Sequence, residues 1–160
     1  MPVVAATMRA VIESTDTANL VLVRSGTMHS LPCEDWNHIN RVSGRIVGSS
    51  PGVHTALGPG LLESAYRACL AYELRKQGVA VAEEVALPVV YDAHRLELGY
   101  RVDILVEDLI VVEIKSVAAI APIHKAQLIS YLKLSGKPLG LLLNFNVVRM
   151  KDGIVRMRNG

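Results

Sequence analysis

The stretch YRVDILVEDLIVVEIKS, residues 100–116, sets a carboxylate, and then a carboxylate and a lysine two positions apart, into two runs of Val, Ile and Leu. The three side chains are Asp103, Glu113 and Lys115. Burying charges in such strands costs several kcal/mol unless the charges are paired or hold a metal ion. The stretch therefore predicts two neighbouring strands that carry a polar site.

The apolar pattern predicts how the two runs pair. Side chains alternate faces along a strand, so every second residue from Val102 to Val106 shares one face, as does every second residue from Ile110 to Ile114. These faces coincide if 104 pairs with 112 and 103 with 113, which leaves a three-residue loop at 107–109. This register brings the three polar side chains onto one face, with opposed Cβ atoms about 5 Å apart.

Two carboxylates and a lysine suit the hydrolysis of a phosphodiester. Asp103 and Glu113 would hold Mg²⁺ or Mn²⁺, with the backbone carbonyl of Ile114 as a further ligand. The ion would polarise the phosphate and acidify a bound water, and Lys115 would place positive charge where negative charge develops. The motif by itself is equally compatible with an ion pair between Glu113 and Lys115 on the strand face.

The pattern Asp103…Glu113-x-Lys115 resembles the core of the PD-(D/E)xK nuclease superfamily. Gln127-x-x-x-Tyr131 resembles a helical motif of its RecB-like members, and GLLESAY at 60–66 is similar to the signature of the GxxExxY protein family. The resemblance extends from about Trp36 to the C-terminus. It implies an α/β fold with a restriction-endonuclease-like core, a central mixed β-sheet of four or five strands flanked by helices.

The resemblance also implies a metal-dependent nuclease that binds nucleic acid, with DNA expected ahead of RNA. Glu63 would support the metal shell beside Asp103 and Glu113, and Gln127 and Tyr131 would position the substrate. Structural alternatives exist: Glu63 could pair with Arg67 one turn later, and Gln127 and Tyr131 could form a hydrogen-bonded pair between helix and sheet. A second class of function is a non-catalytic nucleic-acid-binding or protein-interaction module with the same fold.

Length and composition exclude several classes of protein. A chain of 160 residues suits one domain, and 51% apolar with 20% charged residues is typical of a globular protein. No run approaches the ~20 apolar residues of a membrane helix, and the first residues lack a signal-peptide pattern, so we expect a cytoplasmic protein without a membrane partner. Cys33 and Cys69 are too few for an iron–sulfur cluster. The net charge of +2 permits nucleic-acid binding without arguing for it, and a homodimer stays open.

Residues 1–35 are expected to form a poorly ordered or variable extension, and 36–160 the nuclease-like domain. A first helix is predicted from Trp36 to Leu57, with a break or kink near Pro51, because a proline inside a helix costs ~3 kcal/mol. His54 follows this proline, at a position where some RecB-like nucleases have a metal-binding histidine. A packed or exposed histidine is the commoner case.

The remaining elements are predicted from periodicity and turn residues. The second helix spans Leu61 to Gln77, and its apolar stripe is Leu62, Tyr66, Cys69, Leu70 and Leu74. The other predicted elements are strands at Val85–Tyr91, Leu96–Val106, Ile110–Lys115 and Leu139–Phe145, a helix at Pro122–Leu134, and a hairpin of Val147–Met150 and Ile154–Met157 turning at Asp152-Gly153.

Two further expectations concern the last third of the chain. The helix after Lys115 should cross over to the Leu139 strand and make that strand parallel to its partner. Its apolar residues Ile123, Leu128, Leu132 and Leu134 should mostly face the core. Four basic residues gather near the C-terminus and would serve either as phosphate contacts or as a solvated edge strand: Arg149, Lys151, Arg156 and Arg158.

Overall fold

A computed structural model of the chain describes residues 33–97 and 99–160. The predicted extension at 1–35 therefore lies almost wholly outside the described residues. A mixed five-stranded sheet has the strand order β1-β4-β5-β6-β7, with only β5 and β6 parallel. Its strands are β1 (Val81–Ala86), β4 (Arg101–Val106), β5 (Ile110–Lys115), β6 (Leu139–Asn144) and β7 (Ile154–Arg158).

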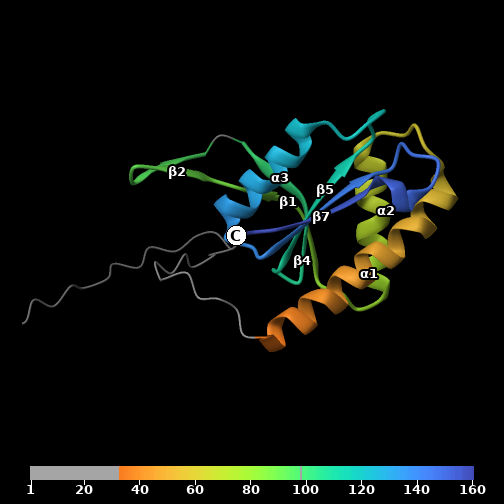
Figure 1. Cartoon of the computed structure of the whole chain (residues 1–160), viewed down its shortest axis with the longest axis horizontal. Coiled ribbons are helices and arrows are strands. Elements are labelled where there is room, and N and C mark those ends of the chain that lie inside the picture. The colour runs from red at the N-terminus through yellow and green to blue at the C-terminus, as the bar shows by residue number, and fades with distance from the viewer. Residues whose placement is uncertain (1–32, 98) are drawn as a thin grey trace, which may run out of the picture. The chain divides into compact units, whose positions relative to one another are not determined.

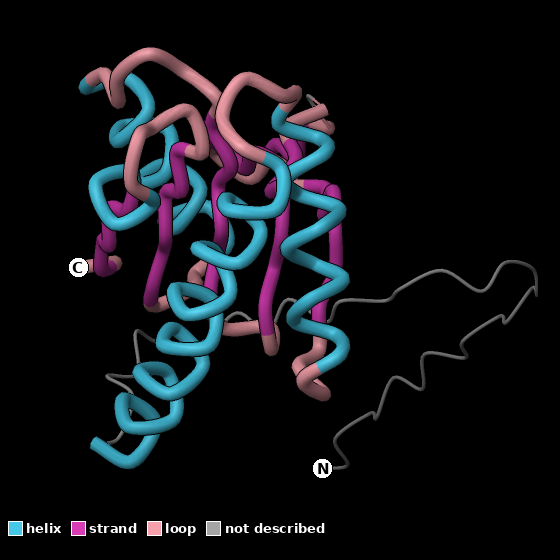
Figure 2. Tube along the Cα trace, turned by 90° about the vertical axis from the view of Figure 1, so that its right-hand side faces the viewer, coloured by secondary structure: helices cyan, strands magenta, loops and turns pink. Residues whose placement is uncertain are grey.

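Helices cover both faces of this sheet. The pair α1 (Cys33–Leu57) and α2 (Glu63–Lys76) lies on one face, and α3 (Pro122–Ser135) lies on the other (Figure 1). The strands run behind α1 and α2 when the molecule is turned (Figure 2). The predicted architecture, a restriction-endonuclease-like α/β fold with a mixed central sheet flanked by helices, is confirmed.

The predicted register of β4 and β5 is confirmed for residues 104–106, and the predicted pair of 103 with 113 lies beyond the end of the ladder. Ile104 pairs with Val112 and Val106 with Ile110, and the loop is the three residues 107–109. The first two loop residues, Glu107 and Asp108, have φ values of 53° and 54°. The predicted apolar face is wrong at one position, because Val102 packs in the cluster beneath α3 and not in the cluster that contains Ile104.

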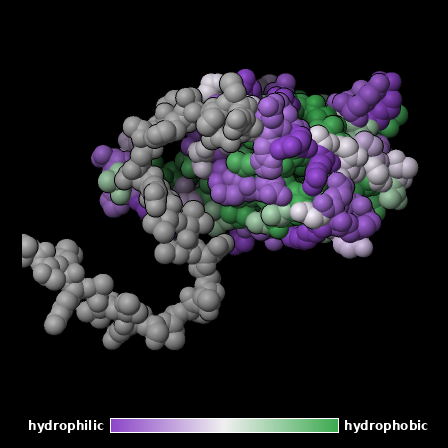
Figure 3. Space-filling model, turned by 90° about the horizontal axis from the view of Figure 1, so that it is seen from below, coloured by the Kyte–Doolittle hydropathy of each residue, from purple (hydrophilic) through white to green (hydrophobic). Residues whose placement is uncertain are grey.

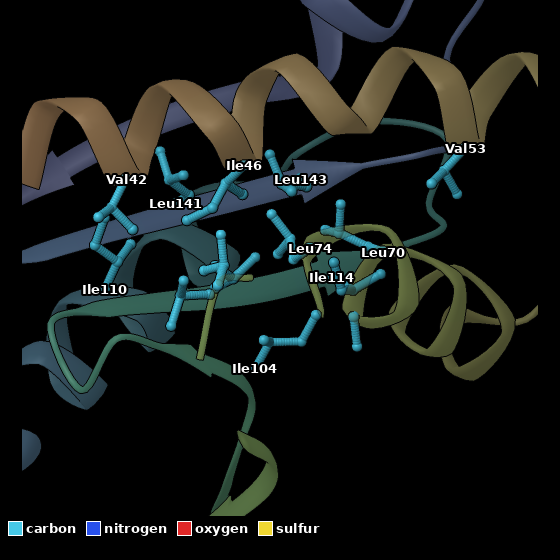
Figure 4. Close-up of a cluster of buried hydrophobic side chains, with 14 of the residues drawn as sticks. Val42, Ile46, Val53, Leu70, Leu74, Ile104, Ile110, Ile114, Leu141 and Leu143 are labelled. Atoms are coloured by element: carbon cyan, nitrogen blue, oxygen red, sulfur yellow. The ribbon is translucent and has the colours of Figure 1, made fainter. Parts of the chain in front are cut away.

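The larger core lies between the sheet and the α1–α2 layer (Figure 4). Side chains of α1 point down onto β5 and β6, and α2 closes the cluster from the side. The residues that meet there include Val42, Ile46, Val53, Leu70, Leu74, Ile110, Ile114, Leu141 and Leu143. Strand β6 is buried along its whole length, as predicted for a strand covered on both faces.

Helix α1 runs through Pro51 without interruption, so the predicted break is wrong. Proline removes one backbone donor at a cost of ~3 kcal/mol. Ile46 and Val53, on either side of it, are buried against the sheet, and each contributes about 1.5–3 kcal/mol by that burial. The hydroxyl of Ser50 also donates to the carbonyl of Ile46 at 2.8 Å. Tertiary packing therefore outweighs the local penalty.

The two strands predicted between α2 and β5, Val85–Tyr91 and Leu96–Val106, are longer than the observed ones. The structure divides this region into β1, the short strands β2 (Val89–Tyr91) and β3 (His94–Leu96), and β4. Strands β2 and β3 form a separate two-stranded hairpin, which projects away from the central sheet (Figure 1).

The predicted hairpin at 147–157 is also wrong. A loop and the 3₁₀ helix Met150–Gly153 precede β7, which pairs antiparallel with β6. Gly153 serves close packing, because a Cβ there would overlap the carbonyl oxygen of Asn144. Helix α3 ends at Ser135, one residue after the predicted end, with Gly136 in the left-handed conformation at φ 66°.

Three side chains assigned to the core are exposed: Leu62, Ile123 and Leu134. Leu62 precedes the first residue of α2, so helical periodicity does not decide its direction. Seen from below, hydrophilic side chains predominate over the visible part of the described surface (Figure 3). Among residues 33–97 and 99–160, no helix is both long and apolar enough to cross a membrane.

Candidate active site

The side chain of Asp103 forms a hydrogen bond between β4 and β5, beyond the last backbone pair of the two strands. Its Oδ2 accepts the N–H of Ile114 at 2.8 Å, where the ladder ends at Ile104 and Val112. Its Oδ1 lies 3.7 Å from Nη1 of Arg67 in α2. One carboxylate oxygen is thus fixed by the backbone, and the other faces the space between β4 and α2.

Glu113 and Lys115 lie in β5 on the same face, as the alternation of the strand requires. Lys115 Nζ donates to Glu113 Oε1 at 2.7 Å, and the Glu113 side chain is only 5% exposed. Glu113 Oε2 is buried and has no hydrogen-bond partner among the described residues. Leaving a buried charged acceptor unsatisfied costs at least ~1–3 kcal/mol, so this oxygen favours a proton or a cation.

Burial dominates the ionisation of this cluster. It raises the pKa of Glu113 to about 7, against the Lys115 hydrogen bond that lowers it, with Asp103 and Glu63 adding to the rise. Burial also raises the pKa of Asp103, although the Ile114 amide, Lys115 and Arg67 oppose it. For Lys115, burial is the largest influence and lowers the pKa, but the Glu113 hydrogen bond and the nearby carboxylates together raise it. The lysine therefore stays charged.

The donor set fits a hard divalent ion. Asp103 Oδ1 and Glu113 Oε2 are the two oxygens without a hydrogen bond from a fixed donor. No three His, Cys, Asp or Glu side chains in the described ranges are spaced as a complete metal site. Mg²⁺ commonly binds one or two carboxylates and keeps several waters, so a carboxylate pair is compatible with it.

Local charge also favours a cation. Five carboxylates gather around these strands against three cationic side chains. The acidic residues are Glu63, Glu83, Glu84, Asp103 and Glu113, and the basic ones are Arg67, Arg75 and Lys115.

Glu63 lies at the first position of α2 and faces the end of β5. Its Oε1 accepts the N–H of Ser116 at 3.1 Å, and the Ser116 hydroxyl donates to the carbonyl of Leu61 at 2.8 Å. Glu63 raises the pKa values of both Asp103 and Glu113 by its charge. The alternative ion pair with Arg67 is not formed, because Arg67 turns toward β1 and β4.

Gln127 and Tyr131 lie one turn apart on α3 and bond to each other. Gln127 Nε2 donates to the Tyr131 hydroxyl at 2.9 Å. Burial raises the pKa of Tyr131, and the charges of Glu113 and Lys115 act on it as well. Tyr131 packs with Val111 of β5 in the cluster beneath α3, so the pair lies against the strand that carries Glu113 and Lys115. Their predicted alternative, a bond between helix and sheet, is replaced by a bond within the helix.

Arg67 is a residue of this cluster that the sequence named only as the alternative ion-pair partner of Glu63. Its side chain is 20% exposed and points at three carboxylates. One of them, Glu84, has a φ of 52° and lies between the pairs Glu83–Ile104 and Val85–Val102, opposite Asp103. The spacing of Glu63 and Arg67, one helical turn apart, was the available signal, because both must share a helix face.

Other candidates have structural contacts elsewhere. His54 Nε2 donates to the carbonyl of Val147 at 2.8 Å and so fixes the loop after β6. Arg156 donates to Asn40 at 2.6 Å, and the guanidinium of Arg158 lies 4.1 Å from the centre of the Trp36 ring. Tyr66, predicted in the apolar stripe of the second helix, stacks on Phe145 and donates to the carbonyl of Gly58 at 2.7 Å.

The fold and the cluster together define the class of this protein. A mixed sheet carries an aspartate on one strand and Glu-x-Lys on the next, and a crossover helix follows; this is a nuclease-like α/β core. The sequence model of the PD-(D/E)XK nuclease superfamily matches residues 40–157, more than half of the chain, and the chain belongs to this superfamily. No curated protein and no solved structure matches the chain.

Proposed function

We propose that this protein is a metal-dependent nuclease that hydrolyses phosphodiester bonds, with DNA as its substrate. Within the superfamily we place it in the RecB-like branch, among GxxExxY proteins, on the motifs at 60–66 and at Gln127 and Tyr131. The observation that carries the proposal is the unpartnered Oε2 of buried Glu113, one strand away from Asp103. The ion pair with Lys115 uses only Oε1 of Glu113, and a divalent ion would bind Oε2.

Asp103 and Glu113 would hold Mg²⁺ or Mn²⁺, which supplies Lewis acidity to the phosphate and acidifies the attacking water. Lys115 keeps a positive charge beside the carboxylate pair and stabilises the charge that develops on the phosphate. Glu63 supports the metal shell from the end of α2, as an outer group already fixed by Ser116. Gln127 and Tyr131 position the substrate from α3.

The test is a nuclease assay on single-stranded DNA, double-stranded DNA and RNA. Wild type is compared with Lys115→Ala, each with Mg²⁺, Mn²⁺ or EDTA. We expect cleavage that needs a divalent ion and falls by about 10²-fold or more in the variant, because the lost charge acts on the transition state. Lys137→Ala is the matched control, since Lys137 pairs with Asp108 at the exposed loop between β4 and β5.

A second candidate is a binding module that keeps the fold without turnover. Arg67 beside Asp103 and Lys115 on Glu113 partly neutralise the two carboxylates without any metal. Wild type that binds nucleic acid but cleaves no more than the Lys115→Ala background, over the whole substrate panel, would decide for this module.

The remaining assignments follow the nuclease proposal. Residues 36–160 form the catalytic domain, and the cytoplasm is the proposed compartment for a chain with two cysteines. Neither an iron–sulfur cluster nor a membrane partner is required.

A further inference from the structure

The guanidinium of Arg67 is surrounded by acceptors but poorly bound to them. It lies 3.7 Å from Asp103, 3.8 Å from Glu83 and 3.3 Å from Glu84. Its Nε is buried and has no hydrogen-bond partner among the described residues. A well-formed charged hydrogen bond is about 2.7–2.9 Å long, so each of these contacts is loose.

Arg75, on the same helix, has the short hydrogen bonds expected of an arginine with a structural role. Two turns after Arg67, it donates to Glu83 at 2.9 Å and to the carbonyl of Val81 at 3.1 Å. These bonds already tie α2 to β1, and the Arg75 side chain is 49% exposed. Because Arg75 already joins α2 to β1, Arg67 is not needed for that role. Its three nitrogens face three different carboxylates, and Nη1 faces the free oxygen of Asp103.

We propose that Arg67 is the phosphate-binding residue of this site, donating to non-bridging oxygens of bound nucleic acid. This inference rests on the proposed nuclease function. A divalent ion held by Asp103 would neutralise the carboxylate that now attracts Arg67, which frees the guanidinium for another anion. The planar fork of arginine matches phosphate oxygens, and its unsatisfied donors gain the short bonds that the carboxylates do not give.

The experiment measures binding of a short fluorescein-labelled DNA, single- and double-stranded, in Mn²⁺. It is done in the Lys115→Ala background so that turnover does not consume the probe. Arg67→Ala, Arg67→Lys and the matched control Arg75→Ala are compared. Arg67→Ala should weaken binding by about tenfold and reduce the salt slope by about one. Arg67→Lys should restore the slope but only part of the affinity, and Arg75→Ala should change affinity by less than about twofold.

Two further measurements separate this role from a structural one. Calorimetric titration with Mn²⁺ should give Arg67→Ala an affinity equal to or tighter than wild type, because a cation beside Asp103 is removed. Its urea midpoint should match that of Arg75→Ala. Loss of Mn²⁺ binding, or a large fall in the midpoint of both Arg67 variants, would assign Arg67 to the scaffold and overturn the proposal.

The DNA measurements distinguish the phosphate-binding role of Arg67 from the proposed nuclease function. If Arg67→Ala binds DNA as tightly as Arg75→Ala, the phosphate role is wrong even when wild type cleaves. If wild type binds DNA through Arg67 but does not cleave, the nuclease function fails while the phosphate role stands. If wild type binds no nucleic acid, both are overturned.

Discussion

Replacing Glu113 by Gln should change how the stability of the metal-free protein depends on pH. The pKa of Glu113 is about 7 in the folded chain, against an ordinary value of 4.5. Between these values the folded state holds the proton and the unfolded state does not. The free energy of unfolding of wild type therefore falls as pH rises through this window. The total is about 3 kcal/mol, most of it between pH 5 and pH 8.

The assay is urea unfolding in EDTA at several pH values from 5 to 8, followed by far-UV circular dichroism. Glu113→Gln removes the titrating group but keeps an oxygen for Lys115. The free energy of unfolding of Glu113→Gln, relative to that of wild type, should therefore rise by about 2–3 kcal/mol from pH 5 to pH 8. Glu73→Gln is the control for the loss of a carboxylate as such, since Glu73 pairs with Lys76 on α2 and takes no part in the cluster of Asp103 and Glu113.

Metal provides a second arm of the same experiment. Excess Mn²⁺ at pH 8 should restore the stability that wild type loses, because a ligand that binds only the folded state stabilises it by mass action. It should have little effect on Glu113→Gln. A difference between wild type and Glu113→Gln that stays constant within about 0.5 kcal/mol from pH 5 to pH 8 would refute the reasoning that Glu113 is held near neutrality by burial.

Three other outcomes are expected. Calorimetric titration with Mn²⁺ should show binding in the tens-of-micromolar to millimolar range for wild type, roughly that of a carboxylate site that retains waters, and the same heat with Asp103→Asn would contradict the metal assignment. Cleavage by Lys115→Ala should fall by about 10²-fold while DNA affinity changes little; equal losses in both would point to a binding defect. Gly153→Ala should lower the free energy of unfolding by about 1–3 kcal/mol, because the new Cβ meets the Asn144 carbonyl. Gly44→Ala, with open space around it in α1, should leave that free energy unchanged or raise it by up to ~1 kcal/mol. Similar urea midpoints for the two variants would count against the packing at Gly153.

Much of the sheet could be predicted because its rules are local. Alternation along β4 and β5 predicted their register and the three-residue loop, and the burial of β6 and its parallel pairing followed from an apolar run after a crossover helix. The same alternation puts Glu113 and Lys115 on one face. Local rules failed where the chain has an irregularity, as at Val102, beside Glu84 with its positive φ.

The sequence by itself determined the pairing of β5 with β4 and with β6, and the charged side chains that β4 and β5 carry, since period-two alternation is a property of each strand alone. Only the tertiary structure decided that α1 continues through Pro51, because burial of Ile46 and Val53 depends on a sheet formed far along the chain. The same holds for the bare oxygen of Glu113 and the direction of Arg67. Burial and partner geometry arise from contacts between segments far apart in sequence, and these contacts set the pKa values and unsatisfied bonds on which the chemistry depends.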